Sequence, residues 1–296
     1  MERHPILTMK RLVYDAMSLF KRNKIFVYAY VRRQGLGYAR NNWGDDINIS
    51  MLEEISNLKV LIMNRSRLFS RLPVKTYCCI GSILGECHGK KLEIWGSGFR
   101  SEKSRLHVMP AKVHSVRGPL TRQLLLEQGF DCPQVYGDPA LLVSRYYRPQ
   151  VPKRYKYGII PHYIDEKNPL VKAVISRPDV LVISMADYKH WHDIPDAVCS
   201  CEKILSSSLH GLIVADSYGI PNAWVRFSDN IAGGSFKYLD YFASVGRDVP
   251  EPVRIGSFED LEVALQDESL FTVARNIDFE SIINACPFKE HLRDEQ

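Results

Sequence analysis

Short apolar runs alternate with stretches of helical spacing along most of the chain, and this alternation limits the possible folds more than any other feature. Five runs rich in β-branched or aromatic residues occupy the first half: 25–31, 58–62, 76–81, 92–95 and 112–116. Between them, residues 45–57 and 118–129 have helical spacing. Strands that alternate with helices are typical of βαβ units around a parallel sheet covered on both faces. The first half is therefore predicted to be an open α/β domain.

The same alternation resumes after residues 145–156, a basic stretch with two prolines and no apolar period that is the best candidate for a linker. Beyond it, strands are predicted at 157–160, 179–184, 203–206 and 222–227, and helices at 209–218, 236–245, 258–266 and 278–287. The pattern predicts two α/β domains in tandem, residues 1–147 and 148–296, with the C-terminal helices placed to pack back on the first domain. Ligands bind beyond the carboxyl ends of strands in such sheets, so candidate chemistry should directly follow strands.

Positive charge is concentrated at the N-terminus. The formal net charge is +5, and the first 24 residues, with six basic and two acidic side chains, supply +4 of it. The nearly neutral remainder argues against a dedicated nucleic-acid binder, whose basic residues form a stripe across the folded domain. Residues 6–20 place apolar side chains at three- and four-residue spacing, so the segment 6–24 is predicted to form a basic amphipathic helix. Two interpretations stay open: a helix packed on the core with its charges solvated, or a peripheral membrane contact.

The seven cysteines are scattered, and the chain is large enough to fold without disulfides, so we expect reduced thiols in a cytoplasmic protein. No pair of CxxC motifs has zinc spacing, and no metal site is predicted. No apolar run approaches the length of a membrane span, and the N-terminus lacks the features of a signal peptide. The expected location is the cytoplasm, with the cytoplasmic face of the inner membrane as the site of any peripheral contact.

Four polar, glycine-bearing segments follow predicted strands. In the first, NNWGDDIN, Asp45 or Asp46 has the residue type that caps a helix. In the second, glycines after the runs TYCCI and LEIW (Gly81, then Gly96-Ser97-Gly98) either make tight turns or expose N–H groups to an anion. Neither glycine loop matches a dinucleotide or P-loop pattern.

In the third segment, Arg117 ends a strand and Pro119 suits the first turn of the next helix. A guanidinium beside a helix N-terminus favours an anion, and the arginine fork matches a carboxylate or a phosphate. The alternative is an arginine paired with a nearby carboxylate of the protein. In the fourth segment, SSSLHG, His210 begins a helix after a strand; it is either packed there or serves as a general acid or base.

Taken together and in this order, the segments resemble the polysaccharide pyruvyl transferase family. The resemblance runs from about residue 40 to 245 through NNWGDDIN, IGSIL, WGSGF, SVRGPLTRQLLLEQG, YGDPALL, SSSLHGLIVADSYGIPN and GGSFKYLDYFASVG. It implies two Rossmann-like domains that face each other across a cleft, the arrangement called GT-B. It also implies phosphoenolpyruvate as donor substrate, no other cofactor, and transfer of the pyruvyl group onto two hydroxyls of a sugar as a cyclic ketal with release of phosphate.

The resemblance also implies roles for residues. Arg117 matches the family arginine expected to hold the donor's negative groups, and His210 matches the family histidine expected to donate a proton or contact the phosphate. Many members carry an arginine where this chain has Ser208, so a cation is missing, and Lys237, Arg226 or Arg122 is the candidate replacement. The predicted donor site comprises Arg117, Gly118, Ser208, Leu209, His210, Gly96, Ser97, Gly98 and Lys237.

On the acceptor side, in the first domain, we expect Asn42, Trp43, Asp45 and Asp46, with either aspartate orienting or deprotonating a sugar hydroxyl; the catalytic residues are then His210, Asp45 and Asp46. The acceptor is a polysaccharide unit or a lipid-linked precursor. Two other functions compete: a GT-B glycosyltransferase that uses a nucleotide-sugar, and a non-catalytic sugar-binding or assembly protein, which the serine at position 208 keeps open.

Overall fold

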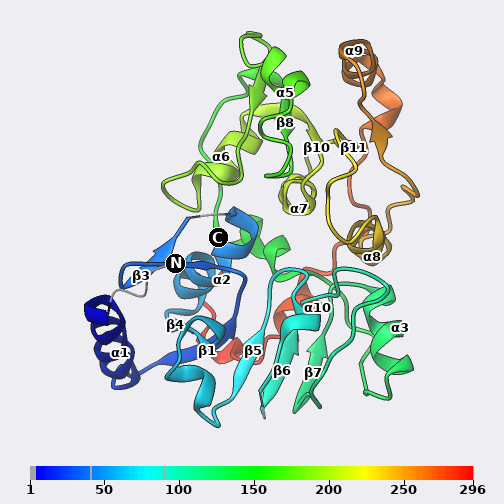
Figure 1. The fold of residues 1–296 in the computed structure, drawn as a ribbon. Helices are drawn as coiled ribbons and strands as arrows, with labels where there is room; N and C mark the ends of the chain where they lie inside the picture. Colours follow the sequence, from blue (N-terminus) through cyan, green and yellow to red (C-terminus); the bar gives the residue numbers. More distant parts are fainter. Residues whose placement is uncertain (1–4, 41, 90, 296) are drawn as a thin grey trace.

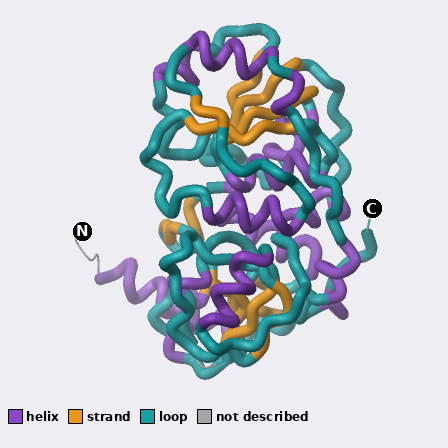
Figure 2. The backbone as a smooth tube through the Cα atoms, turned by 90° about the vertical axis from the view of Figure 1, so that its right-hand side faces the viewer, coloured by secondary structure: helices purple, strands orange, loops and turns teal. Residues whose placement is uncertain are grey.

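The computed structural model describes residues 5–40, 42–89 and 91–295. Asn41 of the first polar segment and residues 1–4 of the basic N-terminus lie outside the described residues. The fold is mixed α/β and is built around two five-stranded parallel sheets. Figure 2 shows the two groups of strands at opposite ends of the molecule with helices packed between them.

The first sheet has the strand order β4-β1-β5-β6-β7, and all its pairings are parallel. Its strands are β1 (Lys24–Tyr28), β4 (Lys59–Ile62), β5 (Thr76–Cys78), β6 (Leu92–Trp95) and β7 (Lys112–Ser115). A small antiparallel hairpin, β2 (Arg32–Gln34) and β3 (Gly37–Ala39), follows β1. Strands β1, β5 and β6 are buried along most or all of their length, which explains why they read as continuous apolar runs.

The second sheet has the order β12-β11-β10-β8-β9 and is also parallel throughout. Its strands are β8 (Tyr155–Ile160), β9 (Val180–Val182), β10 (Cys201–Ser206), β11 (Asn222–Arg226) and β12 (Val253–Arg254). The predicted strands of both halves are therefore present, shifted by one to three residues at their ends. The hairpin and β12 were not predicted, because these short strands are partly exposed and, unlike β5 and β9, do not lie in an apolar run.

Helices connect the strands and cover the sheets (Figure 1). They are α1 (Pro5–Leu19), α2 (Trp43–Ser56), α3 (Pro119–Glu127), α4 (Val143–Tyr146), α5 (Pro169–Ala173), α6 (Asp193–Cys199), α7 (Leu209–Ser217), α8 (Phe236–Ser244), α9 (Phe258–Gln266) and α10 (Phe279–Asn284). Among the described residues, no helix combines the length and the apolar character that crossing a bilayer requires.

One large hydrophobic core runs from the helical face of the first sheet to that of the second. It joins side chains of β1 and α2 with those of α7 and β10, and the indole N–H of Trp43 donates to the carbonyl of Trp191 at 2.7 Å. The C-terminal segment also packs on the first sheet: Trp95 donates to the carbonyl of Ile282 at 2.9 Å, and Phe288 lies edge-on to Trp95. The loops beyond both sheets are therefore held in fixed positions by a continuous apolar core.

Candidate active site

A cavity of about 360 Å³ lies where loops from the two sheets meet. Its lining from the first half follows β1, β5 and β6 or opens α2: Tyr30, Asn42, Asp45, Ser82, Ile83 and Arg100. Its lining from the second half follows β8, β10 and β11: His162, Tyr163, Ser208, Leu209, His210, Ala232 and Lys237. Larger hollows occur elsewhere on the surface, but this one gathers predicted residues of both the donor and the acceptor side, beyond the carboxyl ends of strands as the sequence predicts.

His210 lies in the first turn of α7, with its ring on the backbone of α2. A Cβ at Gly44 would lie 1.8 Å from the Nδ1 atom of His210, so only glycine at position 44 leaves room for the imidazole. Within the described chain, the buried Nε2 atom of His210 has no hydrogen-bond partner. Burial, with the positive charges of Lys237 and Arg117, lowers the pKa of His210 to about 3. The ring is therefore neutral at pH 7, and its Nε2 atom is available to a ligand.

Asp45 reaches the same cavity from the first turn of α2. Its Oδ2 atom accepts a hydrogen bond from the Asn42 side-chain amide at 2.9 Å. Burial, followed by the nearby charge of Asp46, raises the pKa of Asp45 to about 7. A carboxyl group with this pKa can both give and take a proton near neutral pH. The contact with Asn42 differs from the predicted cap, because the Asp45 carboxylate is bound by a side chain and not by a free backbone N–H of the first turn.

Asp46 points away from Asp45 and lines a separate hollow beside the hairpin. Its Oδ2 atom accepts hydrogen bonds from the Tyr188 hydroxyl at 2.6 Å and from the Asn42 backbone N–H at 3.2 Å. The two neighbouring aspartates, which the sequence leaves equivalent, are thus separated by the structure: Asp45 faces the cavity, and Asp46 holds the start of α2 against the loop that carries Tyr188.

Two cations line the cavity. Lys237, in the first turn of α8, has its pKa lowered to about 8 by burial and by the nearby Arg117, and Asp45 opposes this effect. Arg100 pairs with Glu86 at 2.7 Å and lies over the ring of Tyr30. Of the three candidates for the missing cation, Lys237 is the one among the lining residues, whereas the guanidinium of Arg122 binds the carbonyl of Cys132.

Arg226 also lies outside the lining. Its Nη2 atom donates a hydrogen bond to the Ser235 hydroxyl at 3.2 Å. Sequence reasoning missed Arg100, although this residue directly follows the WGSGF segment, and it missed His162 and Tyr163, which follow β8 after Pro161. The signal that identified His210, a polar residue just beyond a strand, was available for all three.

Arg117 lies behind the cavity wall with no exposed surface. Its Nε atom donates to Asp240 Oδ2 at 2.9 Å, its Nη2 atom donates to the carbonyl of Phe99 at 2.7 Å, and its Nη1 atom donates to the hydroxyl of Ser82, a lining residue. The direct contact with a donor that the sequence predicts is therefore replaced in this structure by an internal ion pair, because the carboxylate of Asp240 occupies the arginine fork.

The same carboxylate fills the anion position at the start of α3. Asp240 Oδ1 accepts the backbone N–H of Thr121 at 2.8 Å, and Oδ2 accepts its hydroxyl at 2.7 Å. A Cβ at Gly118 would lie 1.9 Å from the carbonyl oxygen of Asp240, so glycine at position 118 permits the close contact between α3 and α8. The helix N-terminus is an anion site, and its anion is part of the protein.

The other predicted residues lie outside the cavity lining. Trp43 is fully buried in the core, which corrects the expectation that it contacts an acceptor. Gly96 adopts a positive φ of 82°, and a Cβ there would lie 2.2 Å from Pro139. Ser97 donates its hydroxyl to the carbonyl of Gly81 at 2.7 Å, and a Cβ at Gly98 would lie 2.5 Å from the Arg117 guanidinium. This loop therefore shapes the pocket of Arg117 and does not itself face a ligand.

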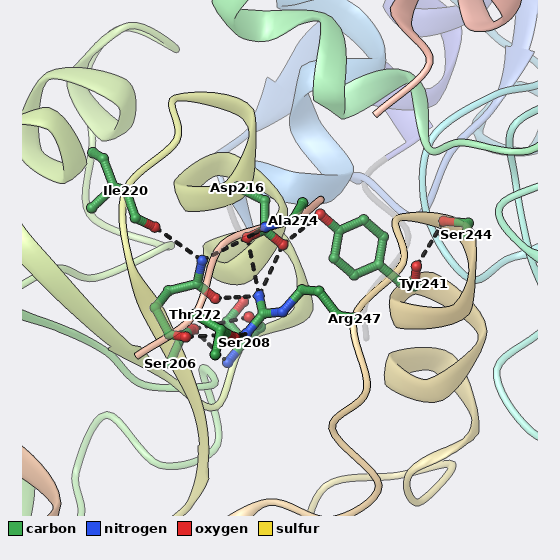
Figure 3. A network of polar contacts seen from close by, with 10 residues as sticks. Ser206, Ser208, Asp216, Ile220, Tyr241, Ser244, Arg247, Thr272 and Ala274 are labelled. Atoms are coloured by element: carbon green, nitrogen blue, oxygen red, sulfur yellow. Dashed lines mark hydrogen bonds and ion pairs between the residues drawn. The ribbon is translucent and has the colours of Figure 1, made fainter. Parts of the chain in front are cut away.

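A second buried network fixes the far end of α7 (Figure 3). Arg247 donates to both carboxylate oxygens of Asp216, at 3.0 and 2.9 Å, and Tyr241 donates its hydroxyl to Asp216 at 2.8 Å. Arg247 also binds the side-chain oxygen of Asn222 at 2.6 Å. Because Asp216 lies in the last turn of α7, the network anchors that end of the helix.

Within the described part of the chain, no group of three or more histidine, cysteine or carboxylate side chains is placed to hold a metal ion. The chemistry that the cavity itself offers is that of two cations, a carboxyl group near its pKa, and two neutral imidazoles, His162 and His210, each with a pKa lowered to about 3 by burial.

Comparison with known proteins gives three likenesses. Residues 76–229 match the model of the family described as polysaccharide pyruvyl transferase. A protein of Acanthamoeba polyphaga mimivirus that is described as uncharacterized is 28% identical over 231 residues, which are 76% of each chain. A solved structure of a functionally uncharacterized protein from Klebsiella pneumoniae subsp. pneumoniae aligns with a TM-score of 0.43 and 13% identity, over 85% of this chain and 99% of that one.

Proposed function

The chain belongs to the polysaccharide pyruvyl transferase family, and from this premise we propose that it moves the pyruvyl group of phosphoenolpyruvate onto two hydroxyls of a sugar. The product is a cyclic ketal, and phosphate is released. We further propose that residues 1–147 bind the acceptor, that residues 148–296 bind the donor, and that the two Rossmann-like units face each other as in GT-B enzymes. The observation that carries the proposal is the meeting of Asp45, His210 and Lys237 in one cavity.

The cavity suits a small anion that carries both a carboxylate and a phosphate. Lys237 and Arg100 supply two positive charges, and the first turn of α7, preceded by Ser208, directs its N–H groups toward the cavity end of the helix. A volume of about 360 Å³ is near the lower end of the range for ligand pockets, which favours a three-carbon donor over a nucleotide-sugar. In this proposal Arg117 acts on the donor through Ser82, whose hydroxyl it holds.

The reaction adds two protons, one to the donor's methylene carbon and one to the departing phosphate, and removes one from each of the two sugar hydroxyls. Protonation of the donor's methylene carbon leaves a cationic centre at C2, where the first sugar hydroxyl adds and loses its proton. The C2–O bond to phosphate then breaks as the phosphate oxygen is protonated, and the second hydroxyl closes the ring and loses its proton. We assign the first proton to Asp45, which has a pKa near 7 and can take the proton of the first hydroxyl in return.

We assign to His210 the contact with the departing phosphate. The ring is neutral at pH 7, but a bound trianion next to it favours the charged form and raises its pKa. The imidazolium can then protonate the phosphate oxygen as the C–O bond breaks, and take up the proton of the second hydroxyl. Asn42, which holds the Asp45 carboxylate, fixes the direction in which Asp45 meets the acceptor.

Phosphate release tests this proposal. The protein is incubated with phosphoenolpyruvate and a panel of sugars and oligosaccharides, and inorganic phosphate is measured. We expect release that depends on one acceptor and is lost in His210→Ala, whereas the control His107→Ala, at an exposed position remote from the cavity lining, retains it.

Two outcomes would favour the competing functions. Consumption of a nucleotide-sugar, with phosphoenolpyruvate left intact, would identify a glycosyltransferase. Thermal stabilisation by phosphoenolpyruvate without phosphate release from any acceptor would identify a protein that binds the donor and does not turn it over.

A further inference from the structure

Helix α1 turns its apolar side away from the protein. The exposed stripe consists of Ile6, Met9, Val13, Met17 and Phe20, with exposed fractions from 52% at Val13 to 87% at Phe20. Their spacing of three and four residues places them along one side of the helix and the turn that follows it. A helix at the surface of a globular protein normally buries such a stripe and exposes its polar side. Helix α1 has the opposite orientation, and both views show it projecting from the body (Figures 1 and 2).

Polar contacts on the inner side of α1 fix this orientation. Asp15 is buried, and its carboxylate accepts hydrogen bonds from Arg33 at 2.6 and 2.9 Å and from the Ser66 hydroxyl at 2.6 Å. Turning the apolar side inward would break this ion pair and leave Arg33 without its carboxylate partner, and a broken buried pair is costly. The exposure of the apolar stripe is therefore built into the fold.

Basic side chains surround the stripe. Lys10, Lys21 and Arg22 are exposed, and Arg11 donates to the carbonyl of Gly35 at 2.8 Å, which ties α1 to the turn of the β2–β3 hairpin. That hairpin adds Leu36, which is 41% exposed, and the exposed Arg32. We name the outer patch as the set of Ile6, Met9, Lys10, Val13, Met17, Phe20, Lys21, Arg22, Arg32 and Leu36. Within residues 5–40 the single acidic side chain is Asp15, which faces inward.

We propose that the outer patch binds the surface of an anionic lipid bilayer, with the apolar stripe of α1 inserted among the headgroups. An apolar stripe flanked by lysine and arginine is the pattern of helices that lie in the plane of a bilayer, where burial of apolar area and attraction to anionic lipids act together. Charge decides between a bilayer and a second copy of this chain. Two copies joined through the patch would bring two sets of uncompensated basic residues together, whereas anionic headgroups neutralise them.

The position of the patch gives this contact a consequence for catalysis, which rests on the proposed function. In the sequence, the β2–β3 hairpin lies between two residues that line the cavity: Tyr30 precedes it and Asn42 follows it. Five residues of extended chain from Tyr30 to the hairpin turn span roughly 15 Å. A bilayer under the patch therefore lies near the cavity, and the substrate class this favours is a sugar carried on a lipid.

The test is sedimentation with vesicles of phosphatidylcholine alone and of phosphatidylcholine mixed with phosphatidylserine. We expect binding to the mixed vesicles that is about tenfold stronger than to the neutral ones and that weakens with added salt. The double variant M17E/F20E should lose about tenfold in binding, because it removes two exposed apolar side chains and adds charge. The variant K21E/R22E should lose a similar amount.

Matched controls carry the same changes elsewhere. Met109 is 71% exposed and Val263 61% exposed, so M109E/V263E alters two equally exposed apolar side chains outside the patch. K103E/K172E reverses two exposed charges outside it. Both controls should bind mixed vesicles as the unaltered protein does. Because all four variants change exposed side chains, their unfolding temperatures should match that of the unaltered protein.

Vesicle binding needs neither donor nor acceptor, so it is measured independently of the proposed function. Absence of binding to mixed vesicles, or equal losses in the controls and the patch variants, would overturn the proposal. A dimer in light scattering that M17E/F20E converts to a monomer would also overturn it and assign the patch to a second copy. If both proposals hold, M17E/F20E should keep its activity on a water-soluble acceptor and lose activity on the same sugar carried on a lipid in mixed vesicles.

Discussion

Arg117–Asp240 and Arg247–Asp216 are two buried ion pairs of the same chemistry with different surroundings. In both, neither side chain is more than 1% exposed. Arg247 binds Asp216 and Asn222, which lie in the last turn of α7 and in β11 (Figure 3). These three residues are outside the cavity lining. Arg117 binds the carboxylate of Asp240 in α8, and its Nη1 atom donates to the hydroxyl of Ser82, which lines the cavity.

The difference shows how one kind of interaction serves two purposes. The Arg247 network joins elements of the second half to each other, so its loss should affect folding alone. The Arg117 pair joins the first half to α8, which also carries Lys237, and one side of its guanidinium reaches a lining residue. Its loss should therefore affect folding and donor binding together. Two predictions test this contrast directly, and two more concern Gly44 and Asp45 at the start of α2.

The largest effect is expected for Arg247→Met. The change leaves the buried carboxylate of Asp216 without its cation, and such broken pairs cost about 3–5 kcal/mol of unfolding free energy. Urea denaturation measures the loss. The control Arg254→Met removes a guanidinium that is 70% exposed and should change the unfolding free energy little. A stability equal to that of the unaltered protein would mean that Asn222, Tyr241 and the backbone satisfy Asp216 without the arginine.

Arg117→Lys should cost less stability and weaken donor binding. Lysine keeps the charge next to Asp240 but cannot also reach Ser82 and the carbonyl of Phe99, so we expect a loss of about 2–3 kcal/mol in unfolding free energy. Donor affinity, measured by calorimetry with phosphoenolpyruvate, should fall about tenfold. The matched variant Arg247→Lys should lose comparable stability with unchanged affinity. Equal affinities in both variants would remove Arg117 from donor binding.

Gly44→Ala should have a smaller effect on folding and a clear effect on activity. The added Cβ would lie 1.8 Å from His210 Nδ1, so the ring must move or α2 must shift, at about 1–2 kcal/mol. Phosphate release should fall sharply because His210 leaves its position. The control Gly37→Ala adds a Cβ into open space and should behave as the unaltered protein does. Full activity in Gly44→Ala would exclude the present ring position from the mechanism.

The smallest effect, and the one with a pH signature, is expected for Asp45→Asn. Because the pKa of Asp45 is raised to about 7 in the folded state, the folded protein holds a proton that the unfolded chain releases near pH 4. The unaltered protein therefore loses stability as pH rises from about 4 to 7, and the asparagine variant does not. At pH 8 the variant should be more stable than the unaltered protein, with no gain at pH 4.

The exposed Asp187→Asn variant serves as the control and should show no such pH dependence. In the unaltered enzyme, the rate of phosphate release should fall as pH rises through 7, because the proposed acid loses its proton. A pH profile unchanged by Asp45→Asn would assign the proton transfer to another group.

Much of the architecture could be predicted from local pattern. Buried parallel strands must be apolar along their length, so β1, β6, β8 and β10 stood out as continuous runs. His210 and Asp45 could be found because polar residues just beyond such strands face the ligand side of the sheet. The β2–β3 hairpin could not be predicted, since three-residue strands with mixed burial have no period. The contribution of Arg32 and Leu36 to the outer patch could therefore not be predicted either.

Trp43 shows the limit of motif reasoning. It stands beside Asn42 and Asp45 in the sequence, but the helical turn points its ring into the core, where it packs between the two halves. Helix α1 shows the limit of periodicity. The pattern predicted an amphipathic helix, but the pairing of Asp15 with Arg33 decided that the polar side faces inward.

What the sequence by itself determined is that an arginine beside a helix start, at Arg117 and Pro119, must meet an anion, because a guanidinium and free N–H groups cannot be buried unpaired. Only the tertiary structure decided which anion it is. Asp240, more than a hundred residues further along the chain, is brought there when α8 packs on α3, and its carboxylate is the internal partner that the sequence left open as the alternative to a ligand. Local sequence fixes the kind of partner that a buried charge needs, and long-range packing selects the partner.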